Sequence, residues 1–419
     1  MISLIKGFRD IAPPDVELWQ HVEATARKLF SDFGFSEIRL PIMEKTELFA
    51  RGIGADTDIV EKEMYTFTDR GGEMLTLRPE ATAGVARAYI EHNMAAVDPV
   101  RKLFTTGPMF RRERPQKGRF RQFYQLNAEL FGVPGPAADV QAILLLVTLL
   151  KRLDTPDVTV HLNSLGCPEC RPAYKALLTE YVAARSAALC ENCVRRGSTN
   201  PLRVLDCKAP DCRVAMIGAP AISEHLCPAC REHFALVTEG LGALGIQFEL
   251  NPRLVRGLDY YTRTTFEVQT TSLGAQNAVA GGGRYDGLLE ALGGPPTPAV
   301  GFAIGMDRLL ELLAENGAKV EPRALVFLAC LGDDAQKLGF SWLCALNLAG
   351  VAAEMDFFGR SLKSQMKRAD RLGARYVLML GGDELNNRAA VLRNMATKEQ
   401  EPVPFASLVE TVAARLSAA

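Results

Sequence analysis

The sequence predicts a multidomain α+β chain that ends in a smaller α/β domain. Its 419 residues suffice for roughly two to four domains at about 150 residues each. A cysteine-rich zone with mainly helical patterns, from about residue 167 to 245, separates two zones of helices and strands. Strand and helix patterns then alternate from residue 324 to 419, which predicts a small α/β domain with a mainly parallel sheet.

The composition excludes a mainly disordered or fibrous protein, because 48% of the residues are hydrophobic and 23% are charged. With a net charge of −1, any nucleic acid must bind through local basic patches. The N-terminal residues lack the features of a signal peptide. The longest apolar run, residues 140–150, is too short to cross a bilayer, so we expect a cytoplasmic protein without a membrane partner.

The first zone opens with an amphipathic helix followed by a strand. Five apolar residues recur near helical spacing: Trp19, Val22, Ala26, Leu29 and Phe30. Gly34 ends this helix, and the segment FSEIRLPIME that follows it predicts a strand reaching Pro41.

A basic hairpin is predicted next, with strands at residues 102–110 and 120–131 joined by a polar loop. Six lysines or arginines and one acid, Glu113, lie between Arg111 and Arg121. This excess of positive charge fits either a solvated loop or a site that binds phosphate, because arginine presents a planar fork to phosphate oxygens.

The second strand of the hairpin favours the ligand site. Gln125, Asn127 and Glu129 are spaced two apart and therefore share one face of the strand. A row of amides and a carboxylate within a sheet is costly unless something pairs with it. Next to the arginine-rich loop, this row predicts the floor of a site for a polar ligand.

These segments resemble the class II aminoacyl-tRNA synthetases. The hairpin, about residues 101–131, is similar to motif 2 through FRRERPQKGRFRQFYQLNAELFG. GFAIGMDR opens a segment, about 301–312, that is similar to motif 3, and residues 19–41 resemble the dimer-forming motif 1. RGLDYYT at 256–262, GGGRYDGL at 281–288 and TLRPEAT at 76–82 narrow the resemblance to the bacterial-type histidyl-tRNA synthetases.

The resemblance implies a catalytic domain over residues 1–323, built on an antiparallel sheet with flanking helices. A Cys-rich helical insertion would occupy 167–245, and an α/β anticodon-binding domain would occupy 324–419. The implied activity is ATP-dependent ligation of L-histidine to histidine tRNA through histidyl-adenylate, in a cytoplasmic homodimer that uses ATP with Mg²⁺. Two alternatives are a histidine-sensing regulatory subunit of ATP phosphoribosyltransferase and a synthetase for another amino acid, such as proline or threonine. The intact signatures and the C-terminal domain disfavour the regulatory subunit, whereas RGLDYYT and GGRYDGL disfavour a synthetase for another amino acid, which would have a similar C-terminal domain.

The resemblance also assigns the phosphate-binding residues. Arg111 would hold the α-phosphate and the histidine carboxylate, and Arg256 would act beside it as a second catalytic arginine. Glu113 would bind the adenine amino group, while Arg119 and Arg308 would bind the γ-phosphate and the adenine. Such a site acts mainly through positioning and charge stabilisation.

The implied histidine-binding residues come from all the signatures. Acceptors for the ammonium would be Glu80, Thr82 and Gln125, and the imidazole would meet Glu129, Tyr261 and Tyr285, with Tyr260 beside them. Ala81, Arg111 and Arg256 complete the set. Two departures from the family pattern are Ala81, where glycine is common, and Asp307, where glutamate is usual; neither removes a charge.

Eight of the ten cysteines lie between residues 167 and 230, mostly as closely spaced pairs. Such pairs suit tetrahedral zinc thiolate sites, and eight thiols could form two Cys₄ sites or one site with spare thiols. Reduced thiols without metal remain the alternative. The candidate ligands of this structural zinc are Cys167, Cys170, Cys190, Cys193, Cys207, Cys212, Cys227 and Cys230.

The C-terminal domain carries a basic stripe on its second predicted helix, at Lys363, Lys367, Arg371 and Arg375. A charged stripe is usually a solvated face, but in a domain that resembles an anticodon-binding domain it is also a candidate contact with RNA phosphates.

Overall fold

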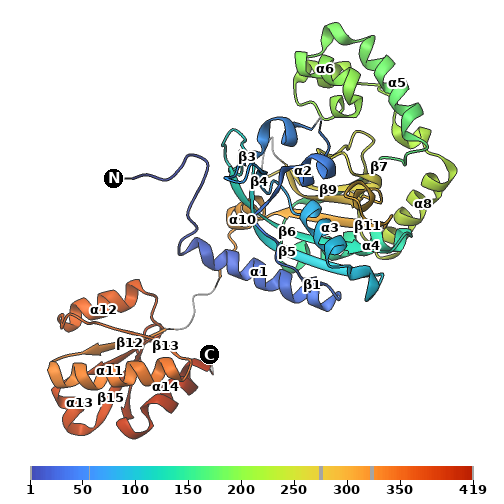
Figure 1. The fold of residues 1–419 in the computed structure, drawn as a ribbon. Coiled ribbons are helices and arrows are strands. Elements are labelled where there is room, and N and C mark those ends of the chain that lie inside the picture. Colours follow the sequence, from blue (N-terminus) through green and yellow to red (C-terminus); the bar gives the residue numbers. More distant parts are fainter. Residues whose placement is uncertain (1, 56, 273–276, 321–324, 418–419) are drawn as a thin grey trace. The chain divides into compact units, whose positions relative to one another are not determined.

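The computed structural model describes residues 2–55, 57–272, 277–320 and 325–417. The chain divides into two compact units, Met1–Lys319 and Val320–Ala419 (Figure 1). In the described part of the chain, none of the helices combines the length and apolarity that crossing a membrane requires.

An eight-stranded sheet with the order β1-β5-β6-β11-β10-β9-β7-β8 forms the centre of the first unit. Its six inner strands pair antiparallel, and only the short edge strands β1 and β8 pair parallel to their neighbours. The strands are β1 (Ser36–Glu37), β5 (Arg101–Phe110), β6 (Gln122–Phe131), β7 (Val158–Ser164), β8 (Glu249–Leu250), β9 (Thr262–Thr270), β10 (Ala278–Arg284) and β11 (Ala299–Gly305). The antiparallel sheet expected for the catalytic domain is therefore confirmed.

Helices cover both faces of this sheet. On one face α1 (Asp15–Asp32), α4 (Pro136–Arg152) and α10 (Met306–Glu315) bury the main core, which includes all five apolar residues predicted for the first helix. On the other face, α3 (Thr82–Glu91) and the short α9 (Leu288–Ala291) contribute a second apolar cluster. The polar ligand site lies on this second face.

The predicted hairpin is present as β5 and β6, which pair antiparallel along ten residues each. Leu126, Ala128 and Leu130 enter the main core, so Gln125, Asn127 and Glu129 face the other way, as their spacing predicts. The prediction of a strand that follows Gly34 and reaches Pro41 is largely wrong. Only Ser36–Glu37 pairs there, because the chain then leaves the large sheet.

A three-stranded sheet lies beside the large one and has the order β2-β4-β3. It contains β2 (Met43–Lys45), β3 (Tyr65–Thr68) and β4 (Met74–Leu77), and α2 (Thr46–Ile53) and the π-helix η1 (Ile59–Glu63) connect β2 to β3. Met43, Phe67 and Met74 of this sheet are exposed.

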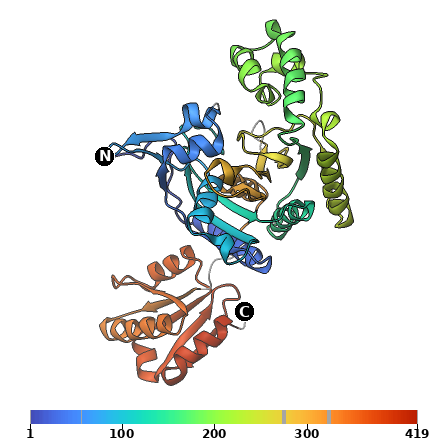
Figure 2. The same ribbon diagram turned by 45° about the vertical axis from the view of Figure 1, so that its right-hand side comes forward.

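The cysteine-rich segment is helical and lies at the β7 side of the large sheet (Figure 2). Its last helix packs on α4 and places Val237 and Leu241 in the main core. The helices are α5 (Arg171–Ala183), η3 (Ser186–Ala188), α6 (Glu191–Thr199), η4 (Pro201–Val204), α7 (Pro210–Ala215), η5 (Ile222–His225) and α8 (Pro228–Ala243).

The second unit contains a five-stranded sheet with the order β13-β12-β14-β15-β16. Two of its strand pairs are parallel and two antiparallel, so the expectation of a mainly parallel sheet is wrong. The difference comes from a C-terminal hairpin that the sequence did not predict. It consists of β15 (Ala389–Asn394) and β16 (Gln400–Pro404). The other strands are β12 (Leu325–Cys330), β13 (Ala352–Met355) and β14 (Tyr376–Leu380).

The helices of this unit are α11 (Asp333–Leu348), α12 (Leu362–Arg371), α13 (Gly382–Asn387), α14 (Leu408–Ser417) and the 3₁₀ turn η6 (Phe405–Ser407). Lys363, Lys367 and Arg371 are exposed on α12, but Arg375 follows the end of that helix and does not belong to its face. The polar linker expected at 315–323 begins where α10 ends, and part of it lies outside the described residues.

Candidate active site and cysteine clusters

A cavity of about 190 Å³ opens on the polar face of the large sheet. Eight of the predicted ligand residues line it together: Glu80, Thr82, Arg111, Gln125, Arg256, Tyr260, Tyr261 and Arg308. They come from the start of α3, from β5–β6, from the segment before β9 and from α10. The structure therefore brings together residues that are up to 228 positions apart in the sequence, between Glu80 and Arg308.

Glu129 lies on β6 next to this cavity and is 1% exposed. Its Oε1 accepts a hydrogen bond from the Thr82 hydroxyl at 2.7 Å, and its Oε2 accepts one from the Tyr285 hydroxyl at 2.5 Å. Burial raises the pKa of the Glu129 carboxyl to about 8. Gly301 lies opposite Glu129 on β11, where a Cβ atom would come within 1.7 Å of Glu129 Oε2. A glycine is required there to make room for the carboxyl group.

Glu80 is buried at the N-terminus of α3. Its Oε2 accepts the Thr82 amide at 2.6 Å and its Oε1 accepts the Ala83 amide at 2.9 Å, so the carboxylate satisfies two free N–H groups of the helix. Burial raises the pKa of Glu80, and these amides oppose that effect. A carboxylate has further lone pairs, so Glu80 can still accept hydrogen bonds from a ligand. Ala81 is fully buried directly before this helix.

Three arginines supply the positive charge of the cavity. Arg111 donates from Nε to the Pro79 carbonyl oxygen at 2.9 Å and lies over the Phe123 ring. Arg308 donates from Nη1 to the Ala278 carbonyl oxygen at 2.8 Å. These contacts fix the guanidinium groups against the cavity wall before any ligand is present.

Arg256 forms an ion pair with Glu267 of β9 and lies over the Tyr261 ring. A Cβ atom at Gly281 of β10 would come within 2.5 Å of the Arg256 guanidinium, so the glycine of GGGRYDGL makes room for that arginine. Burial raises the pKa values of the Tyr260, Tyr261 and Tyr285 hydroxyls above their ordinary range. These phenols therefore remain protonated and can donate hydrogen bonds at neutral pH.

Glu113 and Arg119 do not line the cavity, because they pair with each other in the loop between β5 and β6. Asp307, the position where the family resemblance leads one to expect glutamate, does not line the cavity. Its Oδ1 pairs with Arg9 at 2.7 Å and its Oδ2 accepts the Tyr124 amide at 2.9 Å. Asp307 thus connects the N-terminal segment to β6 and α10.

Unsatisfied amides mark the floor of the cavity. Within the described residues, Gln125 Oε1 and both polar side-chain atoms of Asn127 have no hydrogen-bond partner although they are buried. Buried polar atoms are normally paired, so these atoms indicate a ligand that supplies both donors and acceptors.

Several lining residues were not predicted, and Glu267 is the most important of them. Together with Phe123, Leu258 and Gly281 it lines the cavity, and its Oε1 accepts a hydrogen bond from Gln269 at 2.6 Å. The sequence contains a feature that could have indicated this role, because Glu267 is the one acidic residue in β9 and lies between the apolar residues Phe266 and Val268. Asn127, which also lines the cavity, was predicted to share a strand face with Gln125 and Glu129, but it was not predicted to bind the ligand.

The eight insertion cysteines form two groups of four. Cys167, Cys170, Cys227 and Cys230 make one group, and Cys190, Cys193, Cys207 and Cys212 make the other; within each group all sulfur atoms lie within 4.8 Å of one another. Individual Sγ–Sγ distances are 3.7 Å for Cys167–Cys170 and 4.0 Å for Cys190–Cys207. These distances are too long for disulfides, which require about 2.05 Å. A tetrahedral zinc with Zn–S bonds of about 2.3 Å separates its sulfurs by about 3.8 Å.

Comparison with known proteins gives one consistent family. The histidyl-tRNA synthetase family matches residues 7–191 and 209–309, and the anticodon binding domain family matches residues 326–415. A curated histidine–tRNA ligase of Desulfatibacillum aliphaticivorans is 63% identical over 418 residues and covers 100% of both chains. That of Geobacter sulfurreducens is 54% identical over 417 residues, again with 100% of both chains covered.

Among solved structures, the apo histidyl-tRNA synthetase of S. aureus is similar over 98% of this chain and 99% of its own. The TM-score is 0.83 at 35% sequence identity.

Proposed function

Because the chain belongs to the histidyl-tRNA synthetase family, we propose that it attaches L-histidine to histidine tRNA at the expense of ATP. The observation that carries the proposal is the cavity on the large sheet. It is lined by three arginines, by the buried carboxylate of Glu80 and by two tyrosines, and it leaves buried amides without partners among the described residues.

In the first step, a carboxylate oxygen of histidine attacks the α-phosphorus of ATP. The bond from that phosphorus to the oxygen bridging to the β-phosphate breaks, giving histidyl-adenylate and diphosphate. Arg111 and Arg256 stabilise the charge that develops at the α-phosphate, which is worth most in a site already arranged for it. Their fixed contacts with Pro79 and Glu267 support this role.

The remaining nucleotide contacts use Glu113, Arg119 and Arg308. Glu113 accepts from the adenine amino group, while Arg119 and Arg308 bind the γ-phosphate and stack on the adenine. The Glu113–Arg119 pair must open for this, which makes it a contact of the free enzyme. Mg²⁺ accompanies the ATP phosphates as part of the substrate.

Histidine binds with its ammonium near Glu80, Thr82 and Gln125, and its imidazole meets Glu129, Tyr261 and Tyr285. The free acceptor of Gln125 supports the first contact. Glu129 lies under the cavity beside two hydroxyls, which supports the second. Sites built to hydrogen-bond a side chain reject analogues that lack the bonding group by roughly 10⁴ to 10⁵.

In the second step, a ribose hydroxyl at the end of the tRNA attacks the histidyl carbonyl carbon, and AMP leaves. Residues 324–419 bind the anticodon arm, and the exposed lysines of α12 are candidate phosphate contacts. The histidine-sensing regulatory function is disfavoured, since full-length relatives at 52–63% identity are named ligases and the C-terminal unit is present.

We also propose that the insertion binds two structural zinc ions, one in each cysteine group. Four thiols at tetrahedral spacing, with no aspartate, glutamate or histidine in either group, are the donor set that zinc prefers. These ions would stabilise the insertion by crosslinking its short helices and would take no direct part in ligation.

The protein acts as a cytoplasmic homodimer in this proposal. The β2-β4-β3 sheet begins directly after the segment that resembles motif 1 and exposes Met43, Phe67 and Met74, which supports a dimer interface there. Light scattering of the purified protein measures this directly, and a chain mass of 45.7 kDa rather than twice that value would exclude the dimer.

Histidine-dependent exchange of radiolabelled diphosphate into ATP tests the ligase proposal. Exchange with histidine, none with proline or threonine, and charging of histidine tRNA are the expected results. A protein that binds histidine without exchange would instead have the regulatory function.

A further inference from the structure

The segment from Arg256 to Tyr261 contributes three residues to the proposed histidine site, yet it contains no helix or strand. It carries Arg256, Tyr260 and Tyr261, which all line the cavity. Since no strand pairing fixes its backbone, its position must depend on contacts with other elements.

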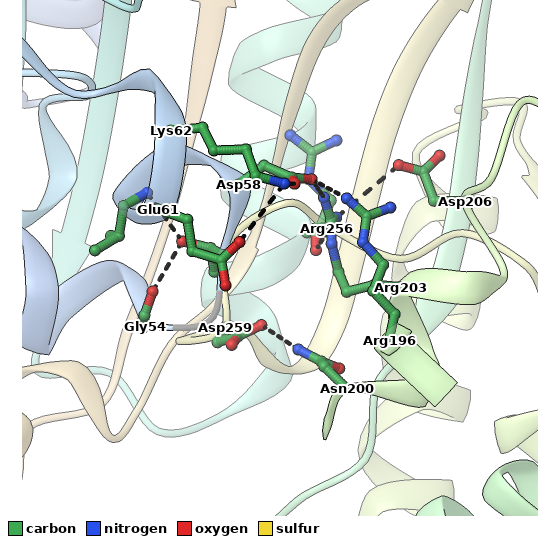
Figure 3. Close-up of polar contacts among 12 residues, drawn as sticks. Gly54, Asp58, Glu61, Lys62, Arg196, Asn200, Arg203, Asp206, Arg256 and Asp259 are labelled. Atoms are coloured by element: carbon green, nitrogen blue, oxygen red, sulfur yellow. Dashed lines mark hydrogen bonds and ion pairs between the residues drawn. The ribbon is translucent and has the colours of Figure 1, made fainter. Parts of the chain in front are cut away.

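Three of those contacts come from the cysteine-rich insertion. Arg203 Nη1 donates to the Arg256 carbonyl oxygen at 3.1 Å. Arg171 Nη2 donates to the Tyr261 carbonyl oxygen at 2.5 Å. Asn200 Nδ2 donates to Asp259 Oδ1 at 3.0 Å (Figure 3). The insertion therefore holds both ends and the middle of the segment.

Each of these donors is tied to a cysteine group. Arg171 directly follows Cys170 and begins α5. Asn200 and Arg203 lie between Cys193 and Cys207, at the end of α6 and in η4. Cys193 and Cys207, which flank residues 194–206, belong to the same group of four sulfurs. This group therefore fixes the backbone positions of Asn200 and Arg203.

Acidic partners fix the direction of Arg203. Its side chain is 13% exposed, and its Nη2 and Nη1 lie 3.6 Å from Asp58 and 3.9 Å from Asp206, respectively. Asp58 also pairs with Arg196 of α6 (Figure 3). A guanidinium that is held by two carboxylates keeps its fork aimed at one carbonyl oxygen.

The same network reaches the other side of the cavity. Asp58 directly precedes η1, and the Glu63 carbonyl oxygen at the end of η1 accepts the Arg112 amide at 2.6 Å. The Asp259 amide donates to the Ile53 carbonyl oxygen at 3.0 Å. The insertion is thus connected to both segments that carry the catalytic arginines.

We propose that Arg171, Asn200 and Arg203 are positioning residues for the histidine site. They hold the 256–261 segment in its binding conformation, so the folded state of the two cysteine groups controls the affinity for histidine. This inference rests on the proposed function only in naming histidine as the ligand; the mechanical link is a property of the contacts themselves.

Arg203→Met tests the link, because it keeps the aliphatic stem and removes all donors. Losing one charged donor to a carbonyl oxygen should raise the dissociation constant and KM for histidine about 10-fold, while KM for ATP changes less than about twofold. Arg203→Lys, which retains the charge near Asp58, should recover part of the affinity. Arg185→Met is the matched control, since Arg185 lies over the Tyr181 ring in the insertion and donates from Nη1 to the Tyr181 carbonyl oxygen rather than to the 256–261 segment.

Hydrogen exchange gives a readout that does not depend on activity. Amides of residues 254–262 should exchange faster in Arg203→Met than in wild type, and amides of the main core should not. A merely destabilised protein would instead show faster exchange throughout and a lower active fraction with both KM values unchanged.

Unchanged histidine affinity and unchanged exchange at residues 254–262 in Arg203→Met would overturn the inference. Absence of histidine-dependent diphosphate exchange in the wild type would refute the proposed function instead. In that case the hydrogen-exchange comparison still decides whether the insertion holds the segment.

Discussion

Replacing Glu129 by glutamine should change the pH dependence of stability in a defined direction. Burial raises the pKa of this carboxyl from 4.5 to about 8, so the folded protein holds its proton more tightly than the unfolded chain does. The stability that this proton contributes is complete below about pH 4.5 and is lost as the pH rises towards 8. Glutamine keeps the shape and cannot ionise.

The magnitude follows from the shift. At about 1.4 kcal/mol for each tenfold change in an ionisation constant, moving the pKa from 4.5 to about 8 corresponds to ~5 kcal/mol. Water that reaches the ionised group lowers this cost. The free energy of unfolding of the wild type should therefore fall by ~2 to 3.5 kcal/mol relative to Glu129→Gln between pH 5 and pH 8, which is the part of the titration that this range covers.

The assay must report on the first unit alone. Trp19 lies in the main core and Trp342 in the core of the second unit, so urea unfolding followed by tryptophan fluorescence in a Trp342→Phe background isolates the first. Glu239→Gln on the exposed surface of α8 is the control and should leave the pH profile unchanged.

A second readout separates the carboxyl's role in binding from its effect on folding. Glu129→Gln should raise KM for histidine about 10- to 100-fold at pH 7.5, because it alters the acceptor next to the imidazole, and should leave KM for ATP nearly unchanged. Parallel stability profiles for the two proteins would refute the argument from burial. A rise in KM for ATP alone would refute the pocket assignment.

Three further predictions concern the arginine, the domains and the metal. Arg256→Ala should slow diphosphate exchange by about 10² to 10³ and preserve the fold, because it removes a preorganised donor; near wild-type exchange would exclude catalysis by this residue. Truncation after Lys319 should retain exchange and sharply reduce tRNA charging; equal charging by both forms would contradict an anticodon role for the second unit. Protein purified under reducing conditions without chelator should contain about two zinc ions per chain, and chelation should open residues 167–230 to proteases and weaken histidine binding. A zinc content below about 0.2 ions per chain would refute the zinc proposal and leave metal-free reduced thiols as the explanation of the two cysteine groups.

Much of the site could be predicted because side-chain alternation survives in the fold. Gln125, Asn127 and Glu129 share a face in the structure since β6 is regular and Leu126, Ala128 and Leu130 on its other face enter the main core. The short signatures predicted the arginines and tyrosines through the resemblance that they carry, and the structure brings most of these residues together around one cavity. Glu267 was missed because a single acid in a strand is common on solvated faces, and only its partner Arg256 reveals its role.

Pairings between distant segments could not be predicted. The grouping of the cysteines depends on how the seven helical elements of the insertion pack, and spacing alone allowed one site or two. The C-terminal hairpin was not predicted because β15 and β16 are short. In addition, β16 contains Pro402 and ends at Pro404, and prolines weaken the sequence pattern of a strand. No motif or spacing in the sequence predicts the hydrogen bond from Arg203 to the Arg256 carbonyl oxygen.

The strands that flank the insertion suggest how it can vary. β7 leads into it and β8 leaves it, and these two strands are hydrogen-bonded neighbours, with His161 opposite Glu249. The chain therefore leaves and re-enters the sheet at the same edge, through a crossover between two parallel strands, so an insertion of another size could replace this one without changing the strand order. Such exchange would act on the substrate site at a distance. Residues 192–208, which carry Asn200 and Arg203, fall between the two ranges that the family shares. A family member with a shorter or cysteine-free insertion would have to hold the 256–261 segment through other contacts, and grafting such an insertion onto this chain would measure how much of the histidine affinity the native contacts supply.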